Sequence, residues 1–392
     1  MAPPAHVLMI ASGLKAQGGG APVSEGGLAK ALSARVVVTV LCAKSRVDRP
    51  FLDRFGIGSW THTYRPIDVL MLLLARGHLW EIFQRADVVH INGHWRWENP
   101  VFGWAAARLR RPYFLHPRGM MAITHRSRIK KRVFNWLLGN RLMSRAAGVI
   151  ALSRFETRDF LGKPISPSLI SIIPNGIDWL ESVGVENKRG YFLYFGRIES
   201  RKNLIFLVEA FARYRLLGGK HELTLMGPVE RSYDLEIGAA ISRFNLNNKV
   251  QIVPPDYGTG RDRLVAGSTA VIYPAVDEAF GRVPFEALAL GVPTLIPERS
   301  GAKEYLAPHL SNILYPTGDL DGLARLMKKQ EDSPNSLEEI QLARKWLKTE
   351  LNWEVIASRI EDLYNRALHG KEKTKGSDPA MSELRRTGNL VI

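Results

Sequence analysis

Cysteine is almost missing from this chain, and its scarcity narrows the kinds of protein that the sequence can encode. Cys42 is the only cysteine among 392 residues, so a disulfide within the chain is impossible and a reducing compartment is expected. Long apolar runs are missing too, because the longest, Val69 to Ala75, is far too short to span a bilayer. The first lysine is Lys15, after the apolar run Val7 to Ile10, so no secretory signal is expected. These absences predict a cytoplasmic protein, either soluble or peripheral at the inner face of the cell membrane.

Acidic residues are scarce in the first half of the chain. Between Glu98 and Glu156 there is none, whereas twelve arginines and lysines lie in that interval. Residues 1–180 carry 25 Lys and Arg against 10 Asp and Glu, so +15 of the total charge of +16 belongs to them. Such an asymmetry indicates an anionic partner for the first half: membrane lipid, a phosphate-bearing acceptor or nucleic acid.

Short apolar runs alternate with helical patterns along the chain, which predicts an α/β fold of doubly wound parallel sheets. We expect a first Rossmann-like domain at 1–180, a second at 186–350, an amphipathic helix at 351–368 and a disordered tail at 369–392. A polar stretch at 181–190 is interpreted as the linker between the domains. The expected strands are residues 6–10, 36–41, 86–93, 112–115 and 148–152, then 191–195, 223–226, 250–253, 270–273 and 294–296.

The segment from Asp277 to Glu286 is the most informative in the chain, because it combines two carboxylates with the start of a helix. Glu278 follows a buried strand, and Pro284 suits the first turn of a helix, where its missing N–H is not needed. A helix N-terminus at the end of a parallel strand is a ready site for a diphosphate. Glu278 and Glu286 then suit hydroxyl groups of a sugar or a ribose on either side of it. The alternative is two solvated glutamates near a helix start.

This pair of glutamates, followed by Ala-Leu-Ala-Leu-Gly-Val-Pro-Thr, resembles the nucleotide-sugar site of the retaining GT-B glycosyltransferases of glycosyltransferase family 4. The resemblance implies the GT-B fold: two Rossmann-like domains facing a central cleft, with a C-terminal helix that crosses back to the first. It also implies that the first domain binds the acceptor and the second the nucleotide sugar. The donor-binding residues that it implies in this segment are Glu278, Phe280, Gly281, Arg282, Val283 and Glu286.

Two cations in a second segment, Arg197 and Lys202, resemble the Gly-Arg-x4-Lys motif of the same family. They come at the end of a strand and the start of a helix, so both side chains can converge on one anion. Retaining transfer needs stabilisation of a departing diphosphate more than it needs a strong base. Arg197 and Lys202 are therefore expected to bind the donor and to act in catalysis, and a solvated basic turn is the alternative.

A glycine loop after the first strand also matches the family. Gly19 and Gly20 would let backbone N–H groups approach the donor phosphate or the transferred sugar. A simple turn is the alternative, and Gly26 and Gly27 depart from the pattern because they fall inside the expected helix.

Four polar residues of the first half are further candidates for the site. Many relatives carry a histidine six residues after a proline, and Arg118 occupies that position after Pro112. Arg118 is therefore expected to contact the substrate, with His116 as a second catalytic candidate or a core histidine. His90 and His94 resemble a family segment on the acceptor side. No cluster of carboxylates or cysteines accompanies the two histidines, so no metal site is expected.

Two other segments admit a functional and a structural interpretation. Asp319-Leu320-Asp321 resembles a metal-binding motif of a different glycosyltransferase class, but its position before a helix predicts a helix cap. Residues 125–138 form a basic helical pattern in which Ile129, Val133, Trp136 and Leu137 share one face. That face could meet a membrane or pack into the domain.

The sequence thus predicts a retaining glycosyltransferase that uses GDP-mannose or a UDP-sugar as donor. Its expected acceptor is a glycan or a lipid-linked acceptor in the biosynthesis of a surface polysaccharide, such as O-antigen or exopolysaccharide. We expect no metal or cofactor beyond the nucleotide-sugar co-substrate. An anionic membrane surface is a candidate partner, and no nucleic acid is expected as one. The alternative is a basic nucleic-acid-binding protein on a catalytically inert GT-B-like scaffold, although no RRM, KH, zinc-finger or helix-turn-helix signature is present.

Overall fold

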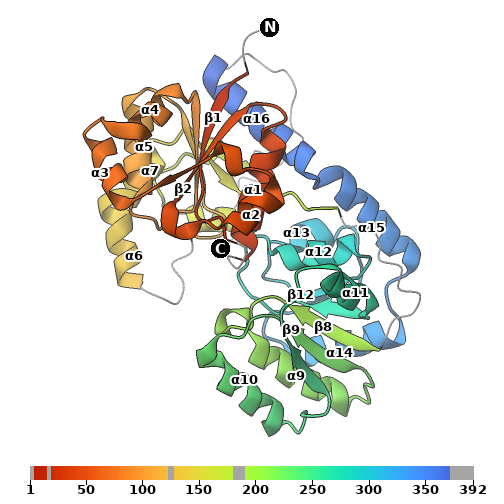
Figure 1. The fold of residues 1–392 in the computed structure, drawn as a ribbon. Coiled ribbons are helices and arrows are strands. Elements are labelled where there is room, and N and C mark those ends of the chain that lie inside the picture. Colours follow the sequence, from red (N-terminus) through yellow and green to blue (C-terminus); the bar gives the residue numbers. More distant parts are fainter. Residues whose placement is uncertain (1–3, 16–18, 122–127, 180–189, 371–392) are drawn as a thin grey trace.

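The computed structural model describes residues 4–15, 19–121, 128–179 and 190–370, which form two α/β domains (Figure 1). Gly18, nearly all of the linker expected at 181–190 and nearly all of the tail expected at 369–392 lie outside the described residues. Each domain is built on one parallel sheet, so the predicted fold class is confirmed. Among the described residues, no helix combines the length and the apolar character that a membrane crossing requires.

The first domain has a seven-stranded sheet in the order β3-β2-β1-β4-β5-β6-β7. Side chains alternate along β1, so Val7 and Met9 face one hydrophobic layer while Leu8 and Ile10 face the other. Helices α1 and α2 cover the first layer, and α3, α4, α5 and α7 cover the second (Figure 1). The strands are β1 (His6–Ile10), β2 (Val37–Ala43), β3 (Thr61–Tyr64), β4 (Val88–Asn92), β5 (Tyr113–His116), β6 (Gly148–Ala151) and β7 (Ile170–Ile172). The helices are α1 (Gly20–Leu32), α2 (Arg49–Phe55), α3 (Pro66–Leu73), α4 (Gly77–Arg85), α5 (Asn99–Arg108), α6 (Arg128–Phe134), α7 (Asn140–Ser144) and α8 (Arg154–Thr157).

The second domain has a six-stranded sheet in the order β10-β9-β8-β11-β12-β13. The strand order of this sheet reverses between β8 and β11, and the order of the first sheet reverses between β1 and β4. Doubly wound sheets bind ligands at such reversal points. Asp319 caps α14 by accepting a hydrogen bond from the Gly322 N–H at 2.8 Å, which confirms the predicted cap. The strands are β8 (Tyr191–Phe195), β9 (Glu222–Met226), β10 (Val250–Val253), β11 (Ala270–Ile272), β12 (Thr294–Pro297) and β13 (Leu314–Tyr315). The helices are α9 (Leu204–Leu216), α10 (Arg231–Arg243), α11 (Thr259–Gly267), α12 (Arg282–Ala289), α13 (Lys303–Leu306), α14 (Leu320–Asp332) and α15 (Leu337–Glu350).

The last helix, α16 (Trp353–His369), leaves the second domain and packs along α1 of the first (Figure 1). Trp353 lies against two glycines: a Cβ added to Gly27 or to Gly176 would come within 2.5 or 2.3 Å of its ring. Its indole N–H donates to Asp178 at 2.7 Å. A Cβ on Gly26 would meet the Phe55 ring at 2.8 Å, so both unexpected glycines of α1 serve close helix packing. The crossing helix thereby joins the two domains into one continuous apolar core.

Candidate active site

The glycine loop predicted in the first domain meets two of the cations predicted in the second. A Cβ added to Gly19 would lie 3.7 Å from the Nε of Arg197, and one added to Gly20 would lie 3.2 Å from Cδ of Arg282. Gly19 also has a φ of +79°, a conformation that glycine adopts without strain. The glycine loop of the first domain therefore lies directly against cations of the second.

Lys202 and Glu278 form an ion pair at the center of this site. The Nζ of Lys202 donates to the Glu278 carboxylate and, at 3.0 Å, to the hydroxyl of Tyr273. Burial favours neutral forms, yet the pKa of Lys202 is raised because Tyr273 and Glu278 stabilise its charge. Burial likewise opposes the charge of Glu278, but Lys202, Arg201 and Arg197 hold the pKa of that carboxyl below its usual value. The pair is ionised at neutral pH.

Arg197 differs from Lys202 in its exposure. Its side chain is 49% exposed and lies 3.2 Å from the carboxylate of Glu199. Because about half of this side chain faces solvent beside Gly19, the guanidinium is accessible to an anion.

Helix α12 begins beside this pair, as the sequence predicted. Gly281 precedes the helix with a φ of +70°, and a Cβ there would come within 3.0 Å of the Tyr273 ring. Glycine is therefore required at this position both by the backbone and by the close approach. Gly281 provides no side-chain cap for α12, so the first N–H groups of the helix are left to donate to another acceptor, such as a bound anion.

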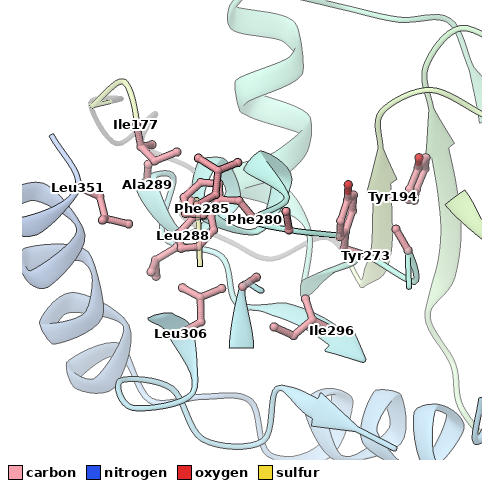
Figure 2. Close-up of a cluster of buried hydrophobic side chains, with 14 of the residues drawn as sticks. Ile177, Tyr194, Tyr273, Phe280, Phe285, Leu288, Ala289, Ile296, Leu306 and Leu351 are labelled. Atoms are coloured by element: carbon pink, nitrogen blue, oxygen red, sulfur yellow. The ribbon is translucent and has the colours of Figure 1, made fainter. Parts of the chain in front are cut away.

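The side chain of Phe280 belongs to the hydrophobic core. Its ring stacks on Phe285 with centroids 4.2 Å apart and 6° between the planes, and only 2% of Phe280 is exposed (Figure 2). Phe280 thus anchors the turn between Glu278 and α12, and its predicted donor contact is limited to backbone atoms. Val283 also packs against the core.

Arg282 and Glu286 form an ion pair within α12. The Nε of Arg282 donates to the Glu286 carboxylate at 3.0 Å, and Arg261 lies 3.6 Å from the same carboxylate. Arg282 also donates to the Gly176 carbonyl at 3.0 Å and to the Ser24 hydroxyl at 3.3 Å. Its side chain therefore ties the two domains together, which sequence reasoning did not predict, while its role in donor binding stays a prediction.

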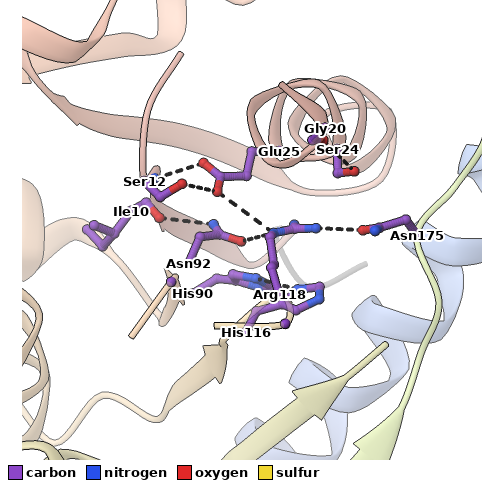
Figure 3. Close-up of polar contacts among 12 residues, drawn as sticks. Ile10, Ser12, Gly20, Ser24, Glu25, His90, Asn92, His116, Arg118 and Asn175 are labelled. Carbon is purple, nitrogen blue, oxygen red and sulfur yellow. Dashed lines mark hydrogen bonds and ion pairs between the residues drawn. The ribbon is translucent and has the colours of Figure 1, made fainter. Parts of the chain in front are cut away.

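Arg118 lies two residues beyond the end of β5, in a buried polar network of the first domain (Figure 3). Its Nε donates to the Asn92 side chain at 2.8 Å, and its Nη1 donates to that of Asn175 at 2.7 Å. Burial lowers the pKa of Arg118 to about 10, so the guanidinium remains charged at neutral pH. A Cβ on the next residue, Gly119, would lie 3.0 Å from Cβ of Ala279, which places this turn against the Glu278–Gly281 segment.

The three candidate histidines are buried inside the first domain. His116 and His90 share a hydrogen bond of 3.3 Å, and His90 contacts the hydroxyl of Tyr364, on α16, at 2.6 Å. His94 contacts the side chain of Asn135 at 2.8 Å. Burial lowers the pKa of His90 to about 3 and that of His94 to about 4, and it holds the pKa of His116 well below its usual value. All three are neutral at physiological pH, and their predicted roles toward substrate and acceptor stay predictions.

Two buried carboxylates of the first domain were missed by sequence reasoning. Glu25, inside α1, accepts hydrogen bonds from the Ser12 N–H and hydroxyl at 2.8 and 2.5 Å. Glu156 accepts from the N–H groups of Gly119 and Leu152 at 2.6 and 2.7 Å. The capping-box pattern Ser-Arg-Phe-Glu at 153–156 was a usable signal for Glu156. Glu25 had no such local signal.

Hydrogen bonds between the two domains hold them against each other on the side of α8. Glu304 of the second domain accepts from the N–H groups of Arg154 and Phe155 at 2.7 and 2.5 Å, so it caps a helix of the first. The Ser153 hydroxyl donates to the Ala279 carbonyl at 2.5 Å, and the Tyr305 hydroxyl donates to the Leu152 carbonyl at 2.7 Å. The structure is therefore that of a closed pair of domains.

The buried carboxyl of Glu156 should make stability depend on pH. Burial raises its pKa to about 7, despite the two N–H donors, whereas an unfolded chain has the ordinary value of about 4.3. Between these values the native state holds a proton that the unfolded chain has lost, so stability falls as pH rises toward 7 and is level above it. Glu156→Gln, which cannot ionise, should lack this component.

The measurement is the melting temperature of both proteins at several pH values. The melting temperature of the wild type minus that of Glu156→Gln should fall by on the order of a few degrees between pH 5 and pH 8. A difference that is constant over this range, or that grows with pH, would show that Glu156 is ionised throughout.

The two parallel-sheet domains and the helix α16 that crosses back to the first have the architecture of a GT-B protein, and comparison with known families agrees. A model described as "Glycosyl transferase 4-like domain" matches residues 18–176, and one described as "Glycosyl transferases group 1" matches residues 177–365. Together they span both domains. The chain belongs to the group 1 glycosyltransferases of the GT4 type, as the sequence predicted.

Several curated proteins are similar to part of the chain. The alpha-maltose-1-phosphate synthase of Mycobacterium tuberculosis is 26% identical, over 56% of this chain and 63% of its own length. The GDP-mannose:cellobiosyl-diphosphopolyprenol alpha-mannosyltransferase of Xanthomonas campestris is 28% identical, over 53% of this chain and 54% of its own. The lipopolysaccharide 1,2-N-acetylglucosaminetransferase of Salmonella typhimurium is 23% identical, over 55% of this chain and 61% of its own length. The chain spans less than two thirds of the length of each of these relatives.

Solved structures share the fold over nearly the whole chain. HepE of Anabaena, in complex with UDP-glucose, has a TM-score of 0.73 at 22% identity and covers 91% of this chain and 98% of its own. The sucrose-phosphate synthase of Thermosynechococcus elongatus has a TM-score of 0.72 at 18% identity, and the match covers 94% of this chain and 100% of the synthase chain. At these identities the likeness shows the GT-B fold.

Proposed function

We propose that the protein is a retaining glycosyltransferase that moves a sugar from a nucleotide-sugar donor to an acceptor. The observation that carries the proposal is the meeting of Lys202, Glu278 and the start of α12 with Arg197 and the Gly19 loop. Fixed cations and helix N–H groups stabilise a leaving diphosphate without reorganising during the reaction. Because Arg197 and Lys202 supply this positive charge, we propose that transfer needs no metal ion or cofactor.

The proposed donor is GDP-mannose or a UDP-sugar. The Xanthomonas relative is named for GDP-mannose, and the Anabaena neighbour was solved with UDP-glucose. The proposed acceptor is a glycan or a lipid-linked acceptor in the biosynthesis of a surface polysaccharide. It is supported by relatives named for lipopolysaccharide, for the O-antigen chain of Salmonella typhimurium and for amylovoran of Erwinia amylovora.

A thermal-shift screen against UDP-sugars and GDP-sugars tests the proposed donor. A donor that binds the native state stabilises it by mass action and so raises the melting temperature. At a donor concentration one hundred times the dissociation constant, the free energy of unfolding rises by about 2.7 kcal/mol. We expect one base to be preferred, and we expect Lys202→Ala to lose most of the shift. No shift with either series, together with salt-sensitive binding of an oligonucleotide, would favour the nucleic-acid alternative instead.

The proposed enzyme works at an anionic membrane surface, and two apolar patches of the first domain support this. Ile129 and Trp136 are 77% and 78% exposed, so the apolar face around α6 does not pack into the domain. Helix α3 exposes a second apolar face with Ile67, Leu70 and Leu74. Helices α3 and α7 both contact α5, and α6 leads into α7, so both patches belong to one side of the domain (Figure 1).

Binding to anionic liposomes is the expected result at low salt. Each Lys or Arg near such a surface adds about 1 kcal/mol, so Lys130, Lys131 and Arg132 should give reversible attachment that high salt weakens. Changing these three to serine, or Ile129 and Trp136 to serine, should reduce co-sedimentation. The control replaces Leu216 and Leu235, two highly exposed leucines of the second domain, with serine.

Equal pelleting of the wild type and both patch variants would contradict this attachment. In that case the basic surface would more directly serve a phosphate-bearing acceptor.

A further inference from the structure

Glu25 is a buried acidic residue of the first domain, and it lies close to Arg118, the residue proposed to contact the substrate. None of its side chain is exposed, and its Oε1 lies 3.9 Å from the Nε of Arg118. Ser12 contributes an N–H to one carboxylate oxygen and its hydroxyl to the other (Figure 3). Burial raises the pKa of Glu25 above its usual value, although Arg118 and the Ser12 donors oppose part of this rise. Each of these contacts offers the carboxyl group a donor or a positive charge.

The guanidinium of Arg118 is fixed on two of its nitrogens but not on the third. Asn92 accepts from Nε and Asn175 accepts from Nη1. Nη2 is buried and has no hydrogen-bond partner in the described part of the chain. A buried N–H group without a hydrogen-bond partner destabilises the folded protein by about 1–3 kcal/mol, and by more when the group is charged. The unpartnered Nη2 of Arg118 therefore indicates that a ligand accepts its hydrogen bond.

The backbone around Arg118 is held in a conformation that the residue rarely adopts. Its φ is +55°, in the left-handed region, and Gly119 follows at +76°. Glu156 accepts from the Gly119 N–H, while Asn92 and Asn175 hold the guanidinium. Strain of this kind persists where the surroundings fix the conformation, and it concentrates at functional sites. The carboxyl group of Glu25 lies close enough to offset part of the free-energy cost of burying the guanidinium.

We infer that Glu25 is a positioning residue: it fixes the guanidinium of Arg118 so that Nη2 remains for a hydroxyl or other oxygen of the transferred sugar. The inference rests on the proposed function, in which Arg118 contacts the sugar of the donor. Two contacts support the location, since Gly119 abuts Ala279 beside Glu278, and Asn175 precedes the Gly176 that Arg282 binds. Glu25 acts only through Arg118 and touches no substrate.

The test uses the full-length protein and four variants: Glu25→Gln, Arg118→Gln, the double variant and Glu331→Gln. Glu331 is the control, because it is a carboxylate of low exposure that binds Tyr214 and the Lys220 N–H in the second domain. Each protein is assayed for transfer, and its affinity is measured for the nucleotide sugar and for the corresponding nucleoside diphosphate. The ratio of the two affinities reports contact with the sugar, and a purely structural role would not change it.

Glu25→Gln should lower kcat by about 10- to 100-fold, because a misplaced contact group costs that much, and it should lower the affinity ratio. Nucleoside diphosphate affinity should stay within about twofold, since the second domain binds it. The double variant should be no slower than Arg118→Gln, because both changes remove one contact. Glu331→Gln should match the wild type in all three measurements.

Two outcomes would overturn the inference, and they are distinguishable. If Arg118→Gln transfers sugar at the wild-type rate, the proposed contact between Arg118 and the sugar is wrong, and the positioning by Glu25 fails with it. If Arg118→Gln is slow but Glu25→Gln is not, or if the losses multiply in the double variant, the contact holds but Glu25 does not act through it.

Discussion

Replacing either Arg197 or Lys202 with alanine is expected to lower the rate of sugar transfer on the order of 10²–10³-fold. Each removes one fixed positive charge from the site that receives the departing diphosphate. The two variants should differ in stability, because the Arg197 side chain is half exposed, whereas loss of Lys202 removes the buried cation that both Glu278 and Tyr273 contact. The melting temperature should therefore change little for Arg197→Ala and should fall for Lys202→Ala.

Initial rates with saturating donor and acceptor provide the measurement. Arg213→Ala serves as the control, since this arginine of α9 pairs with Glu209 and Asp321 at the surface. EDTA should leave the wild-type rate unchanged, because protein cations replace a metal in the proposed mechanism. Strict dependence of the rate on added Mg²⁺ or Mn²⁺, or full activity of both alanine variants, would contradict that mechanism.

Glu286→Ala is expected to weaken binding of the nucleoside diphosphate by about 1–3 kcal/mol, which is roughly 5- to 150-fold in the dissociation constant. The proposed reason is that ribose hydroxyls lose their acceptor inside a closed site. Glu209→Ala is a matched control, because Glu209 and Arg213 on α9 form an i,i+4 pair like that of Arg282 and Glu286 on α12.

Isothermal titration with UDP and with GDP measures this effect directly. If the dissociation constant of the preferred nucleotide is unchanged in Glu286→Ala, the carboxylate serves only to hold Arg282 and Arg261. Glu286→Gln then separates charge from hydrogen bonding, since the amide oxygen can still accept one hydrogen bond from a hydroxyl.

Local patterns were sufficient to predict the strand, turn and helix that position the candidate residues of the second domain. Glu278, Gly281 and α12 lie within a few residues of one another, so the strand, turn and helix that position them are visible in a single segment. Arg197 follows the end of β8 and Lys202 precedes α9, and parallel strands bring such ends to one edge of a sheet. The resemblance to a known family added the chemistry, and the structure confirmed the local geometry.

The first domain was harder to predict because its polar network joins distant segments. Arg118 meets Asn92 and Asn175 from other elements, and its charge partner Glu25 lies 93 positions earlier in a glycine-rich helix. No periodicity links such residues. Gly26 and Gly27 departed from the expected helix pattern, and no nearby residue explained them. The aromatic ring that leaves no room for a side chain at Gly27 belongs to Trp353, near the other end of the sequence.

The placement of α16 has a consequence for how the protein is made. Trp353 fills the space between Gly27 and Gly176, and Tyr364 contacts His90 inside the first domain. Chains are synthesised from the N-terminus, and domains commonly fold as they leave the ribosome. Here the first domain lacks part of its interior until residues 353–369 have been translated. Its folding must therefore be completed after the second domain has emerged, so a chain that stalls before α16 would present an unfinished first domain to chaperones and proteases.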